Sequence, residues 1–313
     1  MAVYVNTNFS ALQGQRYLSN VNNSLTTTYQ RLSSGMRINS AKDDAAGLQI
    51  ADRLTSQING LNQGNRNASD GIALAQTMEA GMDEISGMLQ KIRTLAVQAS
   101  NGTNTVADKQ ALAKEASSLA TEISRIAEQT TFAGKKILFG QQNDDTTIFS
   151  KAATQGDAGK AGNITLQVGS NKGDIIKFSV NSFQFSKIGS RADNAFKANY
   201  ETKNVIKFAN KGVTFQFSVA SAAQVTIGLM DQMIADVDAQ RADLGAIQNR
   251  LESSIRNQSN VAANEADARS RIRDADFAEE SANLSQQSII QQAAASMLMQ
   301  ANTRPQLGLS LLG

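Results

Sequence analysis

Mostly apolar residues recur at alternating steps of three and four in residues 227–255, which read IGLMDQMIADVDAQRADLGAIQNRLESSI. The positions in this repeat are Ile227, Met230, Ile234, Val237, Arg241, Leu244, Gln248, Leu251 and Ile255. A stripe that repeats every 3.5 residues keeps one face of a helix against a partner helix. This segment is therefore predicted to be one long helix that packs along another helix.

The same spacing occurs toward the other end of the chain. It runs through Leu18, Val21, Leu25, Thr28 and Leu32, and again from Leu54 to Ala99. Because each stripe needs a partner, the simplest arrangement pairs the first end of the chain with the last. The predicted fold class is mainly α: a long antiparallel coiled-coil or helical-bundle rod formed by both chain termini, with a small β-hairpin region in the middle of the chain.

Capping signals divide the helical parts. Gly35 is predicted to end a first helix that begins near Asn8. Four capping sequences are predicted to open the later helices: Ser40–Asp43, Thr105–Asp108, Ser221–Gln224 and Asp276–Glu279. The last helix is predicted to end near Pro305, because a proline inside a helix costs about 3 kcal/mol.

The middle of the chain changes to an alternating period. Ile164–Val168 and Ile176–Val180 alternate around the turn 169–173, which predicts a β-hairpin. Val213–Val219 and Val205–Phe208 are predicted to form a second strand pair. Eight of the twelve phenylalanines lie between residues 140 and 222, so this region is predicted to hold its own small apolar cluster.

The amino-acid composition excludes several classes of function. The chain contains no cysteine and no histidine, so thiol and imidazole groups are excluded as nucleophiles, bases and metal ligands. The carboxylates Asp43, Asp44, Asp274, Asp276, Glu279 and Glu280 are interpreted as first-turn residues that the helix dipole stabilises. We therefore predict no catalytic, metal-binding or cofactor-binding residue. A net charge of +2 argues against a nucleic-acid partner.

No stretch approaches the roughly 18 apolar residues of a membrane span, so no membrane insertion is predicted. The first ten residues lack the basic start and apolar core of a secretory signal peptide. The chain is expected either to be soluble in the cell or to leave it by another route.

Two patterns predict contacts with several neighbours. The repeat positions Asn65, Glu79, Arg241 and Gln248 are polar, which either fixes the register of a helix pair or reflects contacts with different helices. The last helix has apolar residues on more than one face, namely Ile289, Ile290, Ala293, Ala294, Met297 and Leu298. A single helix partner cannot cover them all, so the chain is predicted to be a subunit of a larger assembly.

Two segments resemble bacterial flagellin. Leu32–Ile50, LSSGMRINSAKDDAAGLQI, is similar to the N-terminal signature of that family. Ala268–Phe277, ARSRIRDADF, and its sequel through Leu312 are similar to the C-terminal signature. The hairpin Ile164–Val180 also resembles the one that flagellins carry on their rod. The resemblance covers residues 1–140 and 222–313.

The resemblance implies a non-enzymatic structural subunit that polymerises head-to-tail into the helical filament of the bacterial flagellum, used for swimming. Residues 1–40 and 275–313 would form an inner coiled-coil tube, and residues 41–140, 164–180 and 223–274 a helical rod. Residues 141–163 and 181–222 would be a small variable surface segment. The implied location is extracellular, after type III export without a cleaved signal peptide. The implied partners are further copies of the chain, hook-junction and filament-cap proteins, and an export chaperone bound through the C-terminal helix.

The repeat and the resemblance together predict which residues pack in each part. Those predicted to pack in the inner tube are Phe9, Leu12, Val21, Leu25, Leu32, Ile290, Met297 and Leu298. Those predicted to pack in the rod are Ile58, Ile72, Ile85, Leu89, Leu244, Leu251 and Ile255.

An animal Toll-like receptor senses flagellins through the rod. The resemblance places that contact at Gln90, Lys91, Leu95, Gln98 and Glu115. Lys91 stands where recognised flagellins have arginine, and Thr94 stands where they have glutamate. Because lysine cannot reproduce bidentate guanidinium contacts, recognition is predicted to persist in weakened form.

Three alternatives remain open at this point. A hook–filament junction protein shares the plan of the termini but copolymerises only at the filament base. A soluble coiled-coil adhesin or binding module would have structured termini as a monomer. An enzyme is the most distant alternative, since no nucleophile, base or pocket is predicted.

Overall fold

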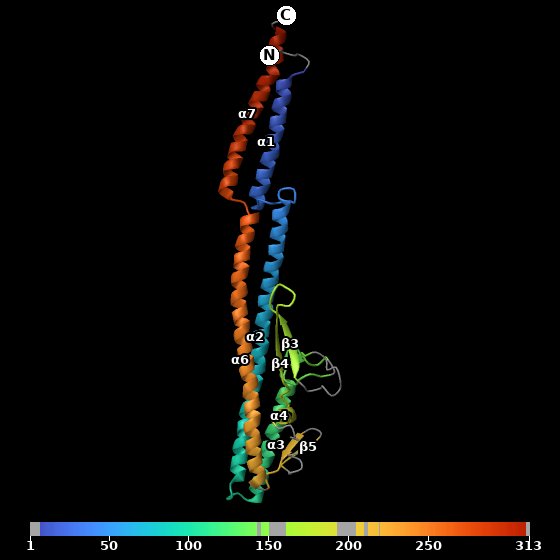
Figure 1. Cartoon of the computed structure of the whole chain (residues 1–313), viewed down its shortest axis with the longest axis vertical. Helices are drawn as coiled ribbons and strands as arrows, with labels where there is room; N and C mark the ends of the chain where they lie inside the picture. The colour runs from blue at the N-terminus through green and yellow to red at the C-terminus, as the bar shows by residue number, and fades with distance from the viewer. Residues whose placement is uncertain are drawn as a thin grey trace. The chain divides into compact units, whose positions relative to one another are not determined.

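The computed structural model divides into two compact units (Figure 1). One unit comprises Met1–Asn59 with Val261–Gly313, and the other comprises Gly60–Asn260. The structure describes residues 7–142, 145–149, 161–192, 205–209, 212–218 and 220–310. Two long helices, α2 (Ala45–Ser100) and α6 (Ala220–Arg273), contribute residues to both units.

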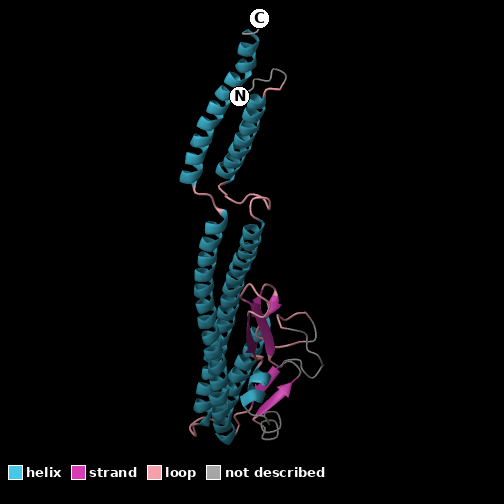
Figure 2. Cartoon of the chain, turned by 45° about the horizontal axis from the view of Figure 1, so that its top comes forward, coloured by secondary structure: helices cyan, strands magenta, loops and turns pink. Residues whose placement is uncertain are grey.

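The first unit pairs helix α1 (Phe9–Ser34) with helix α7 (Phe277–Ser310), which lie side by side (Figures 1 and 2). The predicted ends of α1 are confirmed. Asn8 accepts a hydrogen bond from the N–H of Ala11 at 3.1 Å, and Gly35 closes the helix in the left-handed region with φ 69°.

Helix α7 begins where the sequence predicts but ends later. Asp276 Oδ1 accepts a hydrogen bond from the N–H of Ala278 at 2.8 Å, so the predicted cap is confirmed. The predicted end near Pro305 is wrong, because the helix continues to Ser310. A proline removes one backbone hydrogen bond and need not end a helix whose flanking residues remain helical.

Helix α2 begins later than predicted. The Asp43 carboxylate accepts hydrogen bonds from the N–H of Ser40 at 2.9 Å and of Asn39 at 3.1 Å, which closes a separate turn. These bonds lower the pKa of Asp43. The helix itself starts at Ala45, because Asp44 Oδ1 accepts the N–H of Gly47 at 2.9 Å. The capping residue is therefore Asp44, and the predicted Ser40–Asp43 box precedes the helix.

In the second unit, α2 and α6 pack with helix α3 (Val106–Gln129). The capping box at Thr105 and Asp108 is confirmed, with both reciprocal hydrogen bonds formed. Helix α6 starts at Ala220, so the predicted cap Ser221–Gln224 lies inside its first turn. Fully buried side chains at the centre of this unit include Met78, Met82, Ile85, Leu89, Ile92 and Ile123.

Both predicted strand pairs are confirmed. Strands β3 (Gly162–Gln167) and β4 (Ile175–Val180) are antiparallel, with Ile164 opposite Phe178. Strands β5 (Ile206–Ala209) and β6 (Gly212–Phe215) are also antiparallel, and β6 ends before the predicted Val219. A further pair of two-residue strands, β1 (Thr131–Phe132) and β2 (Lys135–Lys136), is not predicted by the sequence pattern.

Glycines on α2 allow the β3–β4 hairpin to approach the helix closely. A Cβ atom at Gly64 would lie 2.0 Å from the carbonyl oxygen of Val168, and one at Gly60 would lie 2.7 Å from Ser170 Cβ. Such distances are far below van der Waals contact, so a larger residue at Gly64 would push the hairpin away from α2.

The middle of the chain is more buried than the sequence predicts. A short unpredicted helix, α4 (Phe185–Ala192), is fixed by Arg191, which bonds Asp236 of α6 at 2.6 Å and the carbonyl of Ser182 at 2.7 Å. Phe183 and Phe185 are fully buried. They belong to the same core as α2, α3 and α6. The prediction of a separate apolar cluster is therefore wrong, because these phenylalanines are part of the common core.

Candidate assembly surfaces

Acidic side chains among the described residues take part in helix caps and ion pairs. Within the described ranges, no group of three or more acidic side chains could hold a metal ion. A search of the same residues finds no helix that is long and apolar enough to cross a membrane. The acidic residues named from the sequence have structural contacts: Asp276 caps α7, and Glu280 pairs with Arg31.

Large apolar side chains are exposed along both helices of the first unit. Phe9 of α1 is 73% exposed, and Met297 of α7 is 69% exposed. Further exposed residues of this kind on the two helices are Leu12, Tyr17, Tyr29, Phe277, Ile289, Ile290 and Met299. Large apolar side chains that are exposed along two paired helices are typical of protein–protein contact sites.

The residues predicted to pack in the inner tube are mostly not buried in the single chain. Leu25 is buried, whereas Val21, Leu32 and Leu298 are half-buried. Phe9, Leu12, Ile290 and Met297 are exposed. The contact between α1 and α7 therefore accounts for only part of the apolar surface that the sequence marks for burial.

The residues predicted to pack in the rod are placed differently. Ile85, Leu89, Leu244 and Leu251 are fully buried in the second unit. Ile72 and Ile255 are half-buried and pack against the same core. Ile58 lies in the first unit and is buried.

The polar positions of the helix repeat are paired across α2 and α6 in the second unit. Gln248 Nε2 donates to Glu79 Oε2 at 3.0 Å, and Arg241 forms an ion pair with Asp83 at 3.0 Å. Asn65 Nδ2 donates to the Ser259 hydroxyl at 3.3 Å. These residues contact one another within one chain, which agrees with the interpretation that they fix the register of the helix pair.

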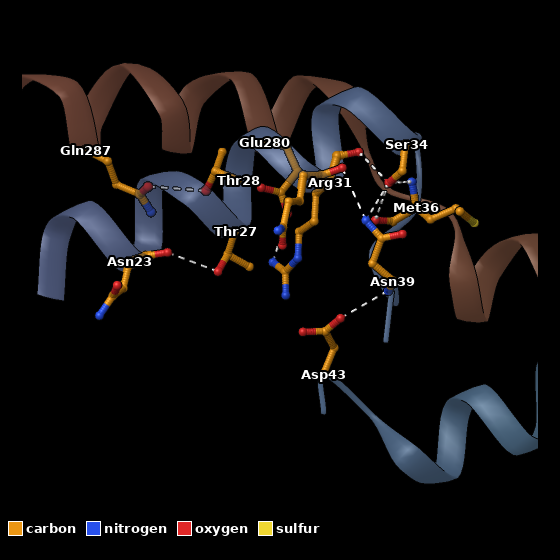
Figure 3. A network of polar contacts seen from close by, with 11 residues as sticks. Asn23, Thr27, Thr28, Arg31, Ser34, Met36, Asn39, Asp43, Glu280 and Gln287 are labelled. Carbon is orange, nitrogen blue, oxygen red and sulfur yellow. Dashed lines mark hydrogen bonds and ion pairs between the residues drawn. The ribbon is translucent and has the colours of Figure 1, made fainter. Parts of the chain in front are cut away.

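Polar contacts also connect α1 with α7. Arg31 and Glu280 form an ion pair at 3.0 Å, and the Thr28 hydroxyl donates to Gln287 Oε1 at 3.2 Å (Figure 3). Glu280 is the one buried residue among the described side chains of α7. The sequence pattern does not show this contact, because a single acidic residue in a first helical turn has an ordinary capping explanation.

The residues assigned to receptor contact come together on α2 and α3. Lys91 Nζ lies 3.2 Å from Glu115 Oε1, and both side chains are about half exposed. Gln90 and Gln98 are exposed on α2. Leu95 is only 7% exposed, so its side chain presents little surface to a partner.

These features define a class of protein: a structural subunit built from long helices, whose exposed apolar side chains are expected to be buried against other protein chains. The comparisons with known proteins agree. Residues 5–143 match the bacterial flagellin N-terminal helical region, and residues 227–312 match the bacterial flagellin C-terminal helical region.

Similar proteins cover the whole chain. Flagellin A of Vibrio cholerae serotype O1 is 35% identical over 385 aligned positions, which span all of both chains. Polar flagellin C of Vibrio parahaemolyticus is 35% identical over 384 positions, again over all of both chains. The chain therefore belongs to the bacterial flagellin family, and it is a non-enzymatic structural subunit of the flagellar filament that serves motility.

One solved structure supports the fold. A putative flagellar hook-associated protein from Vibrio parahaemolyticus is similar with a TM-score of 0.53 at 16% identity. The similarity covers 74% of this chain and 100% of that chain. It shows a shared arrangement of long helices.

Proposed function

We propose that α1 and α7 are the elements through which the filament subunit assembles. Residues 1–40 and 275–313 form the inner tube, and residues 41–140, 164–180 and 223–274 form the rod around it. The observation that carries this proposal is that Phe9, Ile289 and Met297 are mostly exposed among the described residues of the single chain. Such residues are stabilised when they are buried against neighbouring subunits.

Assembly then couples folding with association. The contact surfaces on neighbouring chains differ, so each added subunit offers a new site and the polymer does not close into a ring. Growth should depend steeply on subunit concentration and on both ends of the chain. Hook-junction and filament-cap proteins would contact the same helices at the two ends of the filament.

Seeded polymerisation tests this proposal. The purified chain is expected to extend seeds into long filaments under the electron microscope, whereas a chain truncated at residue 275 is expected not to. Met297→Asp should slow growth strongly, because it places a charge on the apolar surface. Gln300→Asp adds the same charge at an exposed polar position and serves as the control. A full-length chain that only caps seeds would instead be a junction protein.

We propose that the subunit is exported without a cleaved signal peptide, with a chaperone covering α7 beforehand. The exposed Ile289, Ile290 and Met297 would otherwise promote association inside the cell. Mass spectrometry of the extracellular protein is expected to find the N-terminus uncleaved. Ile290→Asp should weaken chaperone co-purification relative to Gln300→Asp, and equal recovery of both would contradict this contact.

The pairing of Lys91 with Glu115 supports a second proposal, recognition by an animal Toll-like receptor. These two side chains bring α2 and α3 into one exposed polar surface with Gln90 and Gln98. The response is expected to be weak, because lysine offers a point charge where arginine offers a planar fork. Lys91→Arg should shift the dose–response curve to lower concentration. An unchanged curve would contradict the proposal.

A further inference from the structure

The described contacts between α1 and α7 follow one antiparallel register. The polar pairs are Asn8–Ala301 at 2.8 Å, Asn22–Gln291 at 2.8 Å, Thr28–Gln287 at 3.2 Å and Arg31–Glu280 at 3.0 Å. As the position on α1 rises from 8 to 31, the position on α7 falls from 301 to 280. The total change is 23 positions on one helix (31 − 8) and 21 on the other (301 − 280), as expected for one antiparallel register.

Apolar burial alone does not select this register. Leu25 and Thr28 are the buried residues of α1. Among the described side chains of α7, Glu280 alone is buried. Where a helix pair has few buried apolar residues, a shift of one heptad sacrifices little contact area, and a buried polar group becomes the feature that distinguishes registers.

In the observed register the described charged residues of the two helices form one ion pair, between Arg31 and Glu280. Helix α1 carries two charged residues, Arg16 and Arg31, and both are basic. The acidic residues of α7 are Glu279 and Glu280, both in its first turn. A shift of seven positions would remove Glu280 from Arg31 and would not bring it to Arg16, which lies 15 positions away.

A shift of seven positions would destabilise the helix pair mainly through Glu280. Its side chain is 8% exposed, whereas that of Arg31 is 32% exposed. A carboxylate that is buried without its partner is strongly destabilising. Arg31 Nε and Glu280 Oε2 are also buried and have no hydrogen-bond partner among the described atoms. A small rotation to a bidentate contact would satisfy both atoms, and only arginine has the planar fork for it.

We infer that Arg31 and Glu280, whose contact Figure 3 shows, are positioning residues that set the register of α1 against α7, because a shift of one heptad would leave the buried carboxylate unpaired. The inference rests on the proposed pairing of these helices in the inner tube. The flanking pair Thr28 and Gln287 supports the same antiparallel alignment, about one turn away on α1 and two turns away on α7.

Cysteine cross-linking reads the register directly, because the natural chain contains no cysteine. A Cβ atom at Gly14 would lie 3.2 Å from Leu298 Cδ1, so Gly14→Cys with Leu298→Cys reports the observed register. Gly14→Cys with Gln291→Cys reports a shift of one heptad. Each pair is oxidised in the full-length free chain and in seeded filaments, and the disulfide yield is measured by mass spectrometry.

When Arg31 and Glu280 are unchanged, a disulfide is expected to form between positions 14 and 298 and not between positions 14 and 291. Arg31→Glu should lower both the 14–298 yield and the rate of filament elongation by roughly tenfold or more. The exchange Arg31→Glu with Glu280→Arg should restore both, and Arg31→Lys should restore them in part. Arg16→Glu makes the same change in net charge at an exposed position and is expected to leave both unchanged.

Two results would overturn the inference. One is an Arg31→Glu variant that behaves like Arg16→Glu in cross-linking, and the other is a charge exchange that restores nothing. If the unsubstituted chain forms no filaments, the proposed assembly is wrong. The cross-link yields of the free chain still decide the register, because oxidation traps the α1–α7 pair each time that it forms.

Discussion

The two helix pairs of this flagellin differ in how much apolar surface they bury within one chain. In the second unit, α2 and α6 bury a mostly apolar stripe, with Met78, Ile85 and Leu251 fully covered. In the first unit, α1 and α7 leave residues such as Phe9 and Met297 exposed and are connected by polar contacts. We therefore expect the second unit to supply its own stability and the first unit to depend on burial against neighbouring subunits.

The comparison explains why one sequence pattern has two outcomes. Both pairs carry residues at heptad spacing, but the pattern does not specify whether the partner surface belongs to the same chain. In the second unit, α3 and the middle segment complete the cover. In the first unit, we expect neighbouring subunits to do so.

The largest expected effect concerns the core of the second unit. Leu89→Ala should lower the free energy of unfolding by about 3 to 4 kcal/mol, because a fully buried side chain is replaced by a cavity. Leu12→Ala is the matched substitution in the first unit, where the side chain is 52% exposed, and it should change the stability of the free chain by less than about 0.5 kcal/mol. Denaturant unfolding of both variants measures this, and equal losses would break the comparison.

The next effect appears in assembly and not in folding. Phe9→Ala should raise the critical concentration for polymerisation by roughly tenfold to thirtyfold, as expected for losing about 2 kcal/mol of apolar burial. The melting temperature of the free chain should stay the same, since Phe9 is 73% exposed there. Sedimentation of filaments from their subunits measures the critical concentration. A lower melting temperature with unchanged assembly would reverse the roles given to the two units.

A smaller effect is expected from the polar contacts between α2 and α6. Gln248→Ala should destabilise the second unit by about 1 kcal/mol, because Glu79 loses its hydrogen-bond donor. Asn249→Ala, at the adjacent exposed position, is the control. A double-mutant cycle of residues 79 and 248 is expected to show a coupling near 0.5 kcal/mol, and zero coupling would mean that the contact does not contribute to this helix pair.

The smallest expected effect concerns two carboxyl groups that accept local hydrogen bonds, those of Asp43 before α2 and of Asp108 at the start of α3. Hydrogen bonds from the Ser40 and Asn39 backbone lower the pKa of Asp43, and hydrogen bonds from Thr105 lower the pKa of Asp108. A lowered pKa stabilises the folded state above the ordinary value of 3.8, and this contribution is lost as the pH falls through 3.8 to the lowered pKa. Titration followed by NMR should find both carboxyls below 3.8. Asp43→Asn should remove the pH dependence at residues 39–43 alone.

The sequence predicts most elements that depend on local signals. The Thr105–Asp108 box and the β3–β4 hairpin are confirmed because capping and alternation act over a few residues. Helix α4 is not predictable in this way, since its eight residues are too few for a period and its anchor, Asp236, is 45 positions from Arg191. The sequence predicts the start of α2 too early, because either of the adjacent residues Asp43 and Asp44 could cap the helix.

The residues of the proposed assembly surface are likewise predictable from the sequence only in part. The sequence predicts that Phe9, Leu25 and Met297 all pack in the inner tube, yet of these three only Leu25 is buried in the single chain. The resemblance assigns Leu95 to a receptor contact, but it carries residue identity and no information on burial. The Arg31–Glu280 contact joins residues 249 positions apart, so only the structure brings them together.

Hydrogen–deuterium exchange of the free chain and of assembled filaments tests the central claim most directly. The free chain is expected to exchange rapidly in α1 and α7 and slowly around Ile85 and Leu89 of α2. In filaments, α1 and α7 should become protected, while the protection of α2 should change little. Protection of α1 and α7 in the free chain equal to that of α2 would contradict the account, because the first unit would then be stable without its neighbours.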